Sequence, residues 1–239
     1  MEGKRQLLLS LSKLLNASRA GRLEEVARRR RHGVSILLDN ILDSGNENAI
    51  IRTMDGMGVQ TLHRVSYGPI TKAHNPKETR TDSGARKWIS IHKWRDINNC
   101  IDHLKTTGTM IVSSYCRPEV HTPFLHELAL PDKPVVFAFG NETEGISDDL
   151  LKRSDLTFRL PMVGFTTSYN VSVSIGMCLY HLHVMEAKRL GMKNQLGVQD
   201  SSTDNDDAFI DTLLFFYERE LGTNTVKEIK ESINYDNEY

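Results

Sequence analysis

The feature that most constrains the fold is an alternation of two kinds of segment through the middle of the chain. Short β-rich runs alternate with helical stretches between residues 34 and 190. This alternation predicts an α/β fold with a mostly parallel sheet, because parallel strands need a crossover between them. The expected strands are residues 34–38, 61–65, 87–91, 109–113, 135–139 and 157–160. The expected helices are residues 49–57, 96–105, 147–151 and 171–190.

Two extensions flank this central domain, which we place at residues 33–190. Residues 1–32 form a basic arm, expected to be helical because leucines recur at helical spacing: Leu7, Leu8, Leu11, Leu14 and Leu15. Residues 191–239 begin with an acidic stretch, 200–207, that we expect to be a flexible linker. A helix follows that carries Ile210, Leu213, Leu214, Phe216 and Tyr217. The residues from Ile229 to the end are expected to form a charged tail.

Composition excludes several classes of protein. The formal net charge of −1 argues against coating nucleic acid through bulk charge, but leaves room for a basic patch. Cys100, Cys116 and Cys178 form no CxxC pair, so no disulfide framework and no metal site are expected. No apolar run reaches the ~18 residues of a membrane helix, so no membrane partner is expected. We expect a cytoplasmic protein, with an organellar transit peptide in residues 1–22 as the alternative.

Two segments follow expected strands and carry polar groups. After the first strand, Asn46 and Asn48 are able to cap a helix. Arg52 lies six residues after Asn46, inside the expected helix beside the apolar Ile51, where it must bind an anion or extend to water. After the fifth strand, Gly140, Glu142, Glu144 and Gly145 form a turn at the position where ligands of open parallel sheets gather. A plain turn remains the alternative there.

Two further segments allow both a structural and a functional interpretation. Residues 160–172 read LPMVGFTTSYNVS, in which Ser168 or Asn170 is able to cap the long helix that follows. The run at residues 28–31 is continued by His32 and is expected to lie on a helix. Such a run is either a solvated helix face or a surface for RNA phosphates. Its members are Arg28, Arg29, Arg30 and Arg31.

Together these segments resemble the SPOUT superfamily of RNA methyltransferases, in its TrmH/SpoU branch of tRNA (guanosine-2′-O)-methyltransferases. The first motif of that branch is matched by Asn46, Arg52 and Thr53. The second is matched by Gly140, Asn141, Glu142 and Gly145, and the third by residues 160–164 and 168–173. The resemblance covers about residues 22–190 in the expected order. Two residues depart from the motifs: Tyr169 replaces the usual Leu, and Gly45 stands where the tRNA enzymes often have His.

The resemblance implies a C-terminal deep trefoil knot, formed by the segments after Phe139 and Leu160, and a homodimer built on the helix that starts near Asn170. It implies S-adenosylmethionine as cofactor, bound largely by main-chain groups. By position these groups belong to Ser114, Gly140, Leu160 and Tyr169. It implies a tRNA substrate, with a guanosine of the D-loop as the expected target. The catalytic set would be Arg52, Asn46, Glu142, Ser168 and Asn170.

The family often treats the motif-one arginine as the general base. Deprotonating an arginine at neutral pH costs about 7–9 kcal/mol. We therefore expect Arg52 to bind the adjacent phosphate and stabilise the developing alkoxide, while the proton leaves late through phosphate or water.

Three alternatives remain open or are rejected on the sequence. An rRNA substrate and an inactive RNA-binding subunit stay open, although the complete catalytic set argues against the second. A nucleotide-dependent oxidoreductase would need a G-x-G-x-x-G after the first strand. Residues 39–45 contain no such motif.

Overall fold

The computed structural model describes residues 2–67, 82–115, 121–130, 133–189 and 207–236. The chain divides into two compact units. One comprises Met1–His32 with Gly197–Tyr239, and the other comprises Gly33–Leu196. Cys100 and Cys178 are buried free thiols, whereas Cys116 lies outside the described residues.

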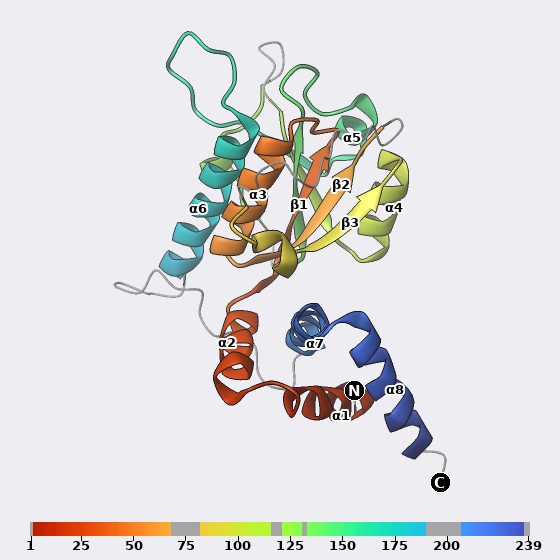
Figure 1. Cartoon of the computed structure of the whole chain (residues 1–239). Helices are drawn as coiled ribbons and strands as arrows, with labels where there is room; N and C mark the ends of the chain where they lie inside the picture. Colours follow the sequence, from red (N-terminus) through yellow and green to blue (C-terminus); the bar gives the residue numbers. More distant parts are fainter. Residues whose placement is uncertain (1, 68–81, 116–120, 131–132, 190–206, 237–239) are drawn as a thin grey trace. The chain divides into compact units, whose positions relative to one another are not determined.

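The larger unit is built on a six-stranded sheet, which confirms the predicted α/β class (Figure 1). The strand order is β3-β2-β1-β5-β4-β6. The pairs β1–β5, β2–β3, β4–β5 and β4–β6 are parallel. The strands are β1 (Arg31–Asp39), β2 (Val59–Val65), β3 (Ser90–Trp94), β4 (Met110–Ser114), β5 (Val135–Gly140) and β6 (Leu156–Phe158).

Helices cover both faces of this sheet, because alternate residues of each buried strand point to opposite faces (Figure 1). Ile36 and Phe137 belong to the core under α3 (Ser44–Gly56) and α6 (Val171–Arg189). Leu37 and Val136 belong to the core under α4 (Ile97–Thr106) and α5 (Asp148–Arg153). The strands therefore read as almost continuous apolar runs.

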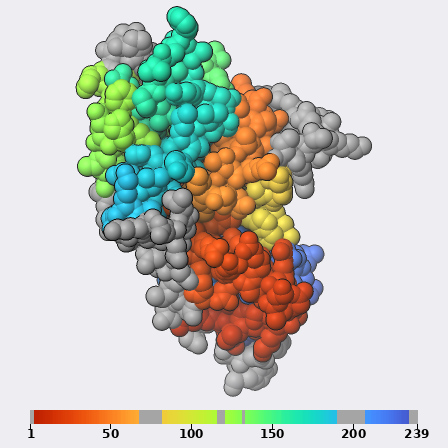
Figure 2. Space-filling model, turned by 90° about the vertical axis from the view of Figure 1, so that its left-hand side faces the viewer, coloured from red at the N-terminus to blue at the C-terminus, as the bar shows by residue number. Residues whose placement is uncertain are grey.

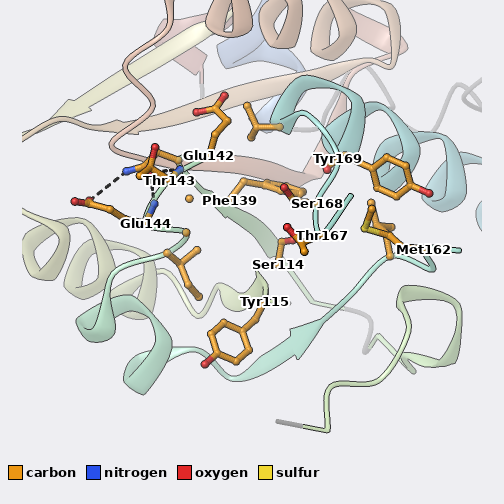
Figure 3. A pocket seen from close by; sticks show the side chains of 17 residues that line it. Ser114, Tyr115, Phe139, Glu142, Thr143, Glu144, Met162, Thr167, Ser168 and Tyr169 are labelled. Atoms are coloured by element: carbon orange, nitrogen blue, oxygen red, sulfur yellow. Dashed lines mark hydrogen bonds between the residues drawn. The ribbon is translucent and has the colours of Figure 1, made fainter. Parts of the chain in front are cut away.

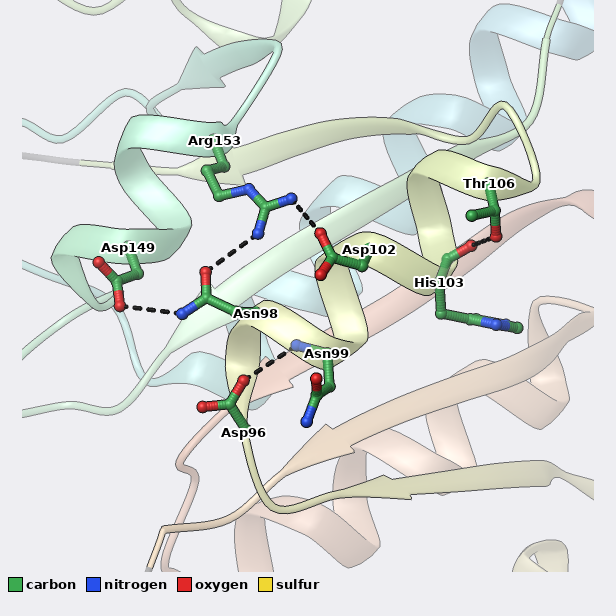
Figure 4. Close-up of polar contacts among 8 residues, drawn as sticks. All are labelled: Asp96, Asn98, Asn99, Asp102, His103, Thr106, Asp149 and Arg153. Atoms are coloured by element: carbon green, nitrogen blue, oxygen red, sulfur yellow. Dashed lines mark hydrogen bonds and ion pairs between the residues drawn. The ribbon is translucent and has the colours of Figure 1, made fainter.

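Polar contacts between α4 and α5 fasten the second of these helical layers (Figure 4). Asp96 caps α4, accepting a hydrogen bond from the main-chain N–H of Asn99 at 2.9 Å. Arg153 donates to Asn98 at 3.0 Å and forms an ion pair with Asp102. Ser147 caps α5, at the position where the sequence predicted a helix to begin.

Two predicted boundaries were wrong. Residues 87–91 are not one strand, because Gly84 in the left-handed region (φ 82°) starts a 3-10 turn, η1 (Ala85–Trp88), and β3 begins only at Ser90. Helix α3 begins at Ser44 rather than at residue 49, because the Asp43 side chain accepts a hydrogen bond from Asn46 N at 2.6 Å. Asn46 therefore lies in the first turn and does not cap the helix.

The described residues of the smaller unit form four helices: α1 (Glu2–Ser12), α2 (Ala17–Arg28), α7 (Asp207–Leu221) and α8 (Thr223–Asp236). Leu7 and Leu11 of α1 are buried, whereas Leu14 lies beyond the helix and is half exposed. The prediction of a charged tail after Ile229 was wrong for residues up to Asp236, because these residues belong to helix α8. Of the predicted acidic linker, only Asp207 is described, and it begins α7.

Among the described residues, no helix is both long and apolar enough to cross a membrane. The same residues contain no group of three or more metal-ligating side chains able to hold an ion.

We expect the larger unit to lose stability in acid through His63. Trp94 donates from Nε1 to His63 Nδ1 at 3.3 Å, and the imidazole is buried. Burial, with repulsion from His92 and His103, lowers the pKa of His63 to about 3, against about 6.5 in the unfolded chain. The unfolded state thus binds the proton first. The free energy of unfolding should fall between pH 6.5 and 3, by at most about 1.4 kcal/mol per pH unit from this group.

Urea unfolding at several pH values measures this slope. His63→Gln should flatten it, whereas His121→Gln, which removes an exposed imidazole, should leave it unchanged. An equal slope in wild type and His63→Gln would contradict the assignment.

Candidate active site

A cavity of about 320 Å³ opens beyond the carboxyl ends of β4, β5 and β6 (Figure 3). This is the edge at which open parallel sheets bind ligands. The four residues predicted to hold a cofactor all line it: Ser114, Gly140, Leu160 and Tyr169. Glu142 and Ser168 also line it, and Figure 3 shows their side chains at its rim.

The loop after β5 folds back tightly on the end of its own strand. A Cβ at Gly140 would lie 1.9 Å from the carbonyl carbon of Gly145, so no other residue fits there. Gly145 itself is left-handed (φ 73°), and its N–H donates to the carbonyl of Asn141 at 3.0 Å. The Asn141 side chain accepts from the main-chain N–H groups of Thr143 and Glu144 at 2.9 and 2.7 Å. The loop that carries Glu142 is thereby fixed.

Asp39, which the sequence reasoning missed, fastens the far end of this loop. It ends β1 opposite Gly140 in the β1–β5 register and is buried. Its carboxylate accepts from Ser147 N at 2.8 Å and from the Tyr67 hydroxyl at 2.7 Å. Burial and this hydrogen bond raise the pKa of Tyr67. The sequence feature that could have identified it is an Asp directly after the apolar run 36–38, at the end of an expected strand.

A chain of side-chain hydrogen bonds joins three segments that are distant in the sequence. Asn170 accepts from Ser172 N at 2.9 Å and donates from Nδ2 to Asn46 Oδ1, also at 2.9 Å. Asn46 in turn donates from Nδ2 to the carboxylate of Glu142. Asn170 directly precedes α6 and accepts from Ser172 N, so its predicted capping role is confirmed. Three of the five predicted catalytic residues are thus in direct contact.

Arg52 extends to water from α3, which is one of the two placements that the sequence allows. Ile51 and Met54 point into the core, whereas the Arg52 side chain is exposed and makes no hydrogen bond or ion pair with any described residue. Arg52 lies six positions after Asn46 on the helix, which corresponds to a rotation of about 120° around α3. Arg52 is therefore free to approach a ligand but does not line the cavity that the described residues form.

The two departures from the motifs have local structural consequences. The Tyr169 hydroxyl donates to the carbonyl of Pro161 at 2.9 Å, which closes the 161–169 loop on itself. A Cβ at Gly45 would lie 3.0 Å from the Asp43 carboxylate that caps α3. Glycine therefore leaves this cap undisturbed.

The four arginines of the basic run do not share one helix, contrary to expectation. Helix α2 ends at Arg28, which pairs with Glu24 at 2.6 Å. Arg30 is 1% exposed, and its guanidinium lies 5.4 Å from the ring centre of Phe216. The side chain of Arg30 is therefore part of the helical core. Arg29 is exposed, and Arg31 is partly exposed at the start of β1.

Comparison with known proteins agrees with this geometry. The model of the SpoU rRNA Methylase family matches residues 33–180. A Borreliella burgdorferi protein named tRNA (guanosine(18)-2′-O)-methyltransferase is 31% identical over 172 residues, 72% of this chain and 76% of that protein. A Thermus thermophilus protein of the same name is 31% identical over 177 residues, 74% of this chain and 84% of that protein.

Among solved structures, the A. aeolicus TrmH/SpoU tRNA modifying enzyme superimposes with a TM-score of 0.67 at 27% identity, covering 84% of this chain and 96% of that chain. The match of the family model over more than half of the chain, with the cavity and the Asn46–Glu142–Asn170 contacts, shows that the chain belongs to the SpoU methylase family.

Proposed function

We propose that this protein transfers a methyl group from S-adenosylmethionine to the ribose 2′-hydroxyl of a guanosine in the D-loop of tRNA. The observation that carries this proposal is the hydrogen-bonded chain of Asn170, Asn46 and Glu142 beside a cavity at the carboxyl edge of the sheet. The names of the relatives from B. burgdorferi and T. thermophilus support tRNA and guanosine.

The cavity fits a cofactor of this kind. Its volume of about 320 Å³ lies at the lower end of the ~300–1,000 Å³ found for small-molecule pockets. Phe139, Ile146 and Met162 give it apolar walls for a planar base, whereas Glu142 and Thr167 give it polar groups. The close approach of chain at Gly140 leaves main-chain groups as ligands, as the family pattern implies. When bound, the cofactor supplies an electrophilic methyl group on a sulfonium centre.

The residues of this chain have the task of holding the ribose and its developing negative charge. Arg52 carries the exposed cation needed to bind the adjacent phosphate and stabilise the alkoxide. The chain of Asn170, Asn46 and Glu142 fixes polar groups from three segments, so little reorganisation is needed when RNA binds. Ser168, exposed at the rim of the cavity, is available to orient the ribose. The hydroxyl proton leaves late to phosphate or water.

We also infer that the segments after Phe139 and Leu160 form a deep trefoil knot. Family membership supports this topology, as do the contacts of the second segment. Arg159 donates from its N–H to the carbonyl of Pro123 and accepts at its carbonyl from Leu125 N at 3.0 Å. Residues 123–125 thus run beside the chain as it leaves β6.

Methyl transfer itself is tested by incubating the protein with isotope-labelled S-adenosylmethionine and either tRNA or rRNA. Digestion to nucleosides and mass spectrometry should show label on 2′-O-methylguanosine from tRNA. Label recovered from rRNA alone would support the rRNA alternative. No label in either RNA would contradict the proposal and leave an RNA-binding subunit.

Arg52→Ala should lower turnover of tRNA by at least about 100-fold, because the phosphate and the alkoxide lose their cation. Cofactor affinity should stay within about twofold, since Arg52 does not line the cavity formed by the described residues. A methylation assay beside a calorimetric titration of cofactor measures both effects. Arg95→Ala, which removes an exposed arginine after β3, is the control. Wild-type turnover in Arg52→Ala would overturn the assignment.

We propose that the protein acts as a homodimer through α6. This helix lies along the surface beside α3 in Figure 2. Val171 and Ile175 are buried in the core of the larger unit. The side chains of Val173, Met177 and Tyr180 on the same helix are 41–53% exposed. Their spacing of three and four residues forms one apolar stripe.

Light scattering at micromolar concentration should therefore give twice the chain mass of 27.1 kDa. Met177→Glu should shift the population toward monomer, because a charge in the stripe opposes burial. Leu9→Glu changes an exposed apolar residue of α1 and should leave the dimer intact. A wild-type monomer across the range would refute the dimer.

We retain RNA binding by the basic run as a proposal, restricted by the structure to its accessible members. Arg29 is exposed although paired with Glu25 at 2.8 Å, and Arg31 is partly exposed. Arg29→Ala with Arg31→Ala should reduce the slope of log K against log salt by about two, because each arginine neutralises one phosphate. Filter binding of tRNA at several salt concentrations measures the slope. Lys227→Ala with Lys230→Ala removes the same charge from α8, and an equal effect of both pairs would contradict a specific role.

A further inference from the structure

A network of charges built on two buried carboxylates lies beneath the first turn of α3. Glu47 pairs with Arg86 at 2.9 Å through one carboxylate oxygen and with Arg64 at 3.3 Å through the other. Arg86 also lies 3.7 Å from Asp82. The side chains of Glu47 and Asp82 are each only 2% exposed. The guanidinium groups of Arg86 and Arg64 are 34% and 20% exposed, so two buried carboxylates are each paired with a partly exposed cation. The network connects α3, β2, η1 and the turn before η1.

This network touches both residues that follow Asn46. Glu47 is the next residue, and Asn48 Oδ1 accepts a hydrogen bond from Arg86 Nη2 at 3.0 Å. Arg86 thus binds two successive side chains of the first turn with its planar guanidinium. On the other side of the same turn, Asn46 contacts Glu142 and Asn170.

Stability alone gives a weak reason for such a network. Burying paired charges costs desolvation that the pairing only about repays, and apolar residues of similar volume often serve equally well. The hydrogen bond from Arg86 to Asn48, with the two ion pairs of Glu47, restricts the position of this turn. A displacement of about 1 Å in a catalytic site costs on the order of 100-fold in rate. The network lies one residue from the central member of the hydrogen-bonded chain.

We propose that Glu47 and Arg86 are positioning residues that hold the Asn46 amide in line with Glu142 and Asn170. Neither residue is among the described residues that line the cavity, and they act through the first turn of α3. The consequence for turnover rests on the proposed methyltransferase function, whereas the consequence for the placement of Asn46 does not.

The test compares Glu47→Gln with Arg153→Gln. The first replaces one carboxylate by a neutral amide of the same shape. The second removes the α4–α5 contacts to Asp102 and Asn98 on the opposite face of the sheet (Figure 4). Side-chain amide resonances of asparagine-labelled protein are recorded without cofactor or RNA, and kcat, KM for tRNA and Tm are then measured.

Glu47→Gln should shift the amide resonances of Asn46 and Asn170 and lower kcat by about tenfold or more, with KM within about threefold. Arg153→Gln should lower Tm yet leave those resonances and kcat unchanged. Arg86→Lys is the variant to use if Glu47→Gln does not fold. It keeps the positive charge near Glu47 but loses the Nη2 group that donates to Asn48. It should shift the same resonances and lower kcat by a smaller factor.

Unchanged resonances and an unchanged kcat in both network variants would overturn the proposal and leave only a structural role. If the wild type transfers no methyl group, the proposed function fails, and the resonances alone still decide whether Glu47 and Arg86 position Asn46.

Discussion

The common direction of the strands is the constraint on which the site depends. Parallel strands bring their carboxyl ends to one edge, so segments that are distant in the sequence meet there. The loop after β1 leads into α3, whose first turn carries Asn46. The loop after β5 carries Glu142, and the segment after β6 leads to Asn170. Crossover helices cover both faces of the sheet, so the carboxyl edge of the strands is the part that remains accessible to ligands. The polar contact between these three residues is a consequence of that arrangement.

Around this edge, the chain fixes its polar groups by contacts that are already complete before any ligand binds. Asp39 holds Ser147, and Gly140 permits the close return of the chain at Gly145. The charged network of Glu47 and Arg86 supports the first turn of α3 from the core side. Arg52 is the contrast, since it has no partner among the described residues. Polar groups that are already held in place, beside an exposed cation, suit the proposed reaction, in which charge develops on the incoming RNA.

The smaller unit shows why a cationic run is a poor guide to a binding surface. Arg28 and Arg29 are paired with glutamates one turn earlier on α2, and Arg19 pairs with Glu220 at 2.8 Å. Arg30 lies over an aromatic ring in the core. Arginine has a long apolar stem and a weakly hydrated head group, so it packs between helices as readily as it binds RNA phosphates.

The sequence by itself determined the α/β class, most strands and the start of a helix near residue 147. These follow from local periodicity and capping chemistry, which are properties of neighbouring residues, whereas the residues expected to bind the cofactor came from the resemblance to a known family. Residues 87–91 show a limit of prediction from local pattern. Their composition suits a strand, but the left-handed Gly84 starts a turn first, so the strand begins later. Only the tertiary structure decided that Asn46 contacts Glu142, that Arg52 is exposed, that Arg30 is buried and that Asp39 fastens the site. Each of these depends on a partner more than 20 residues away or on the rotation of a helix against the sheet.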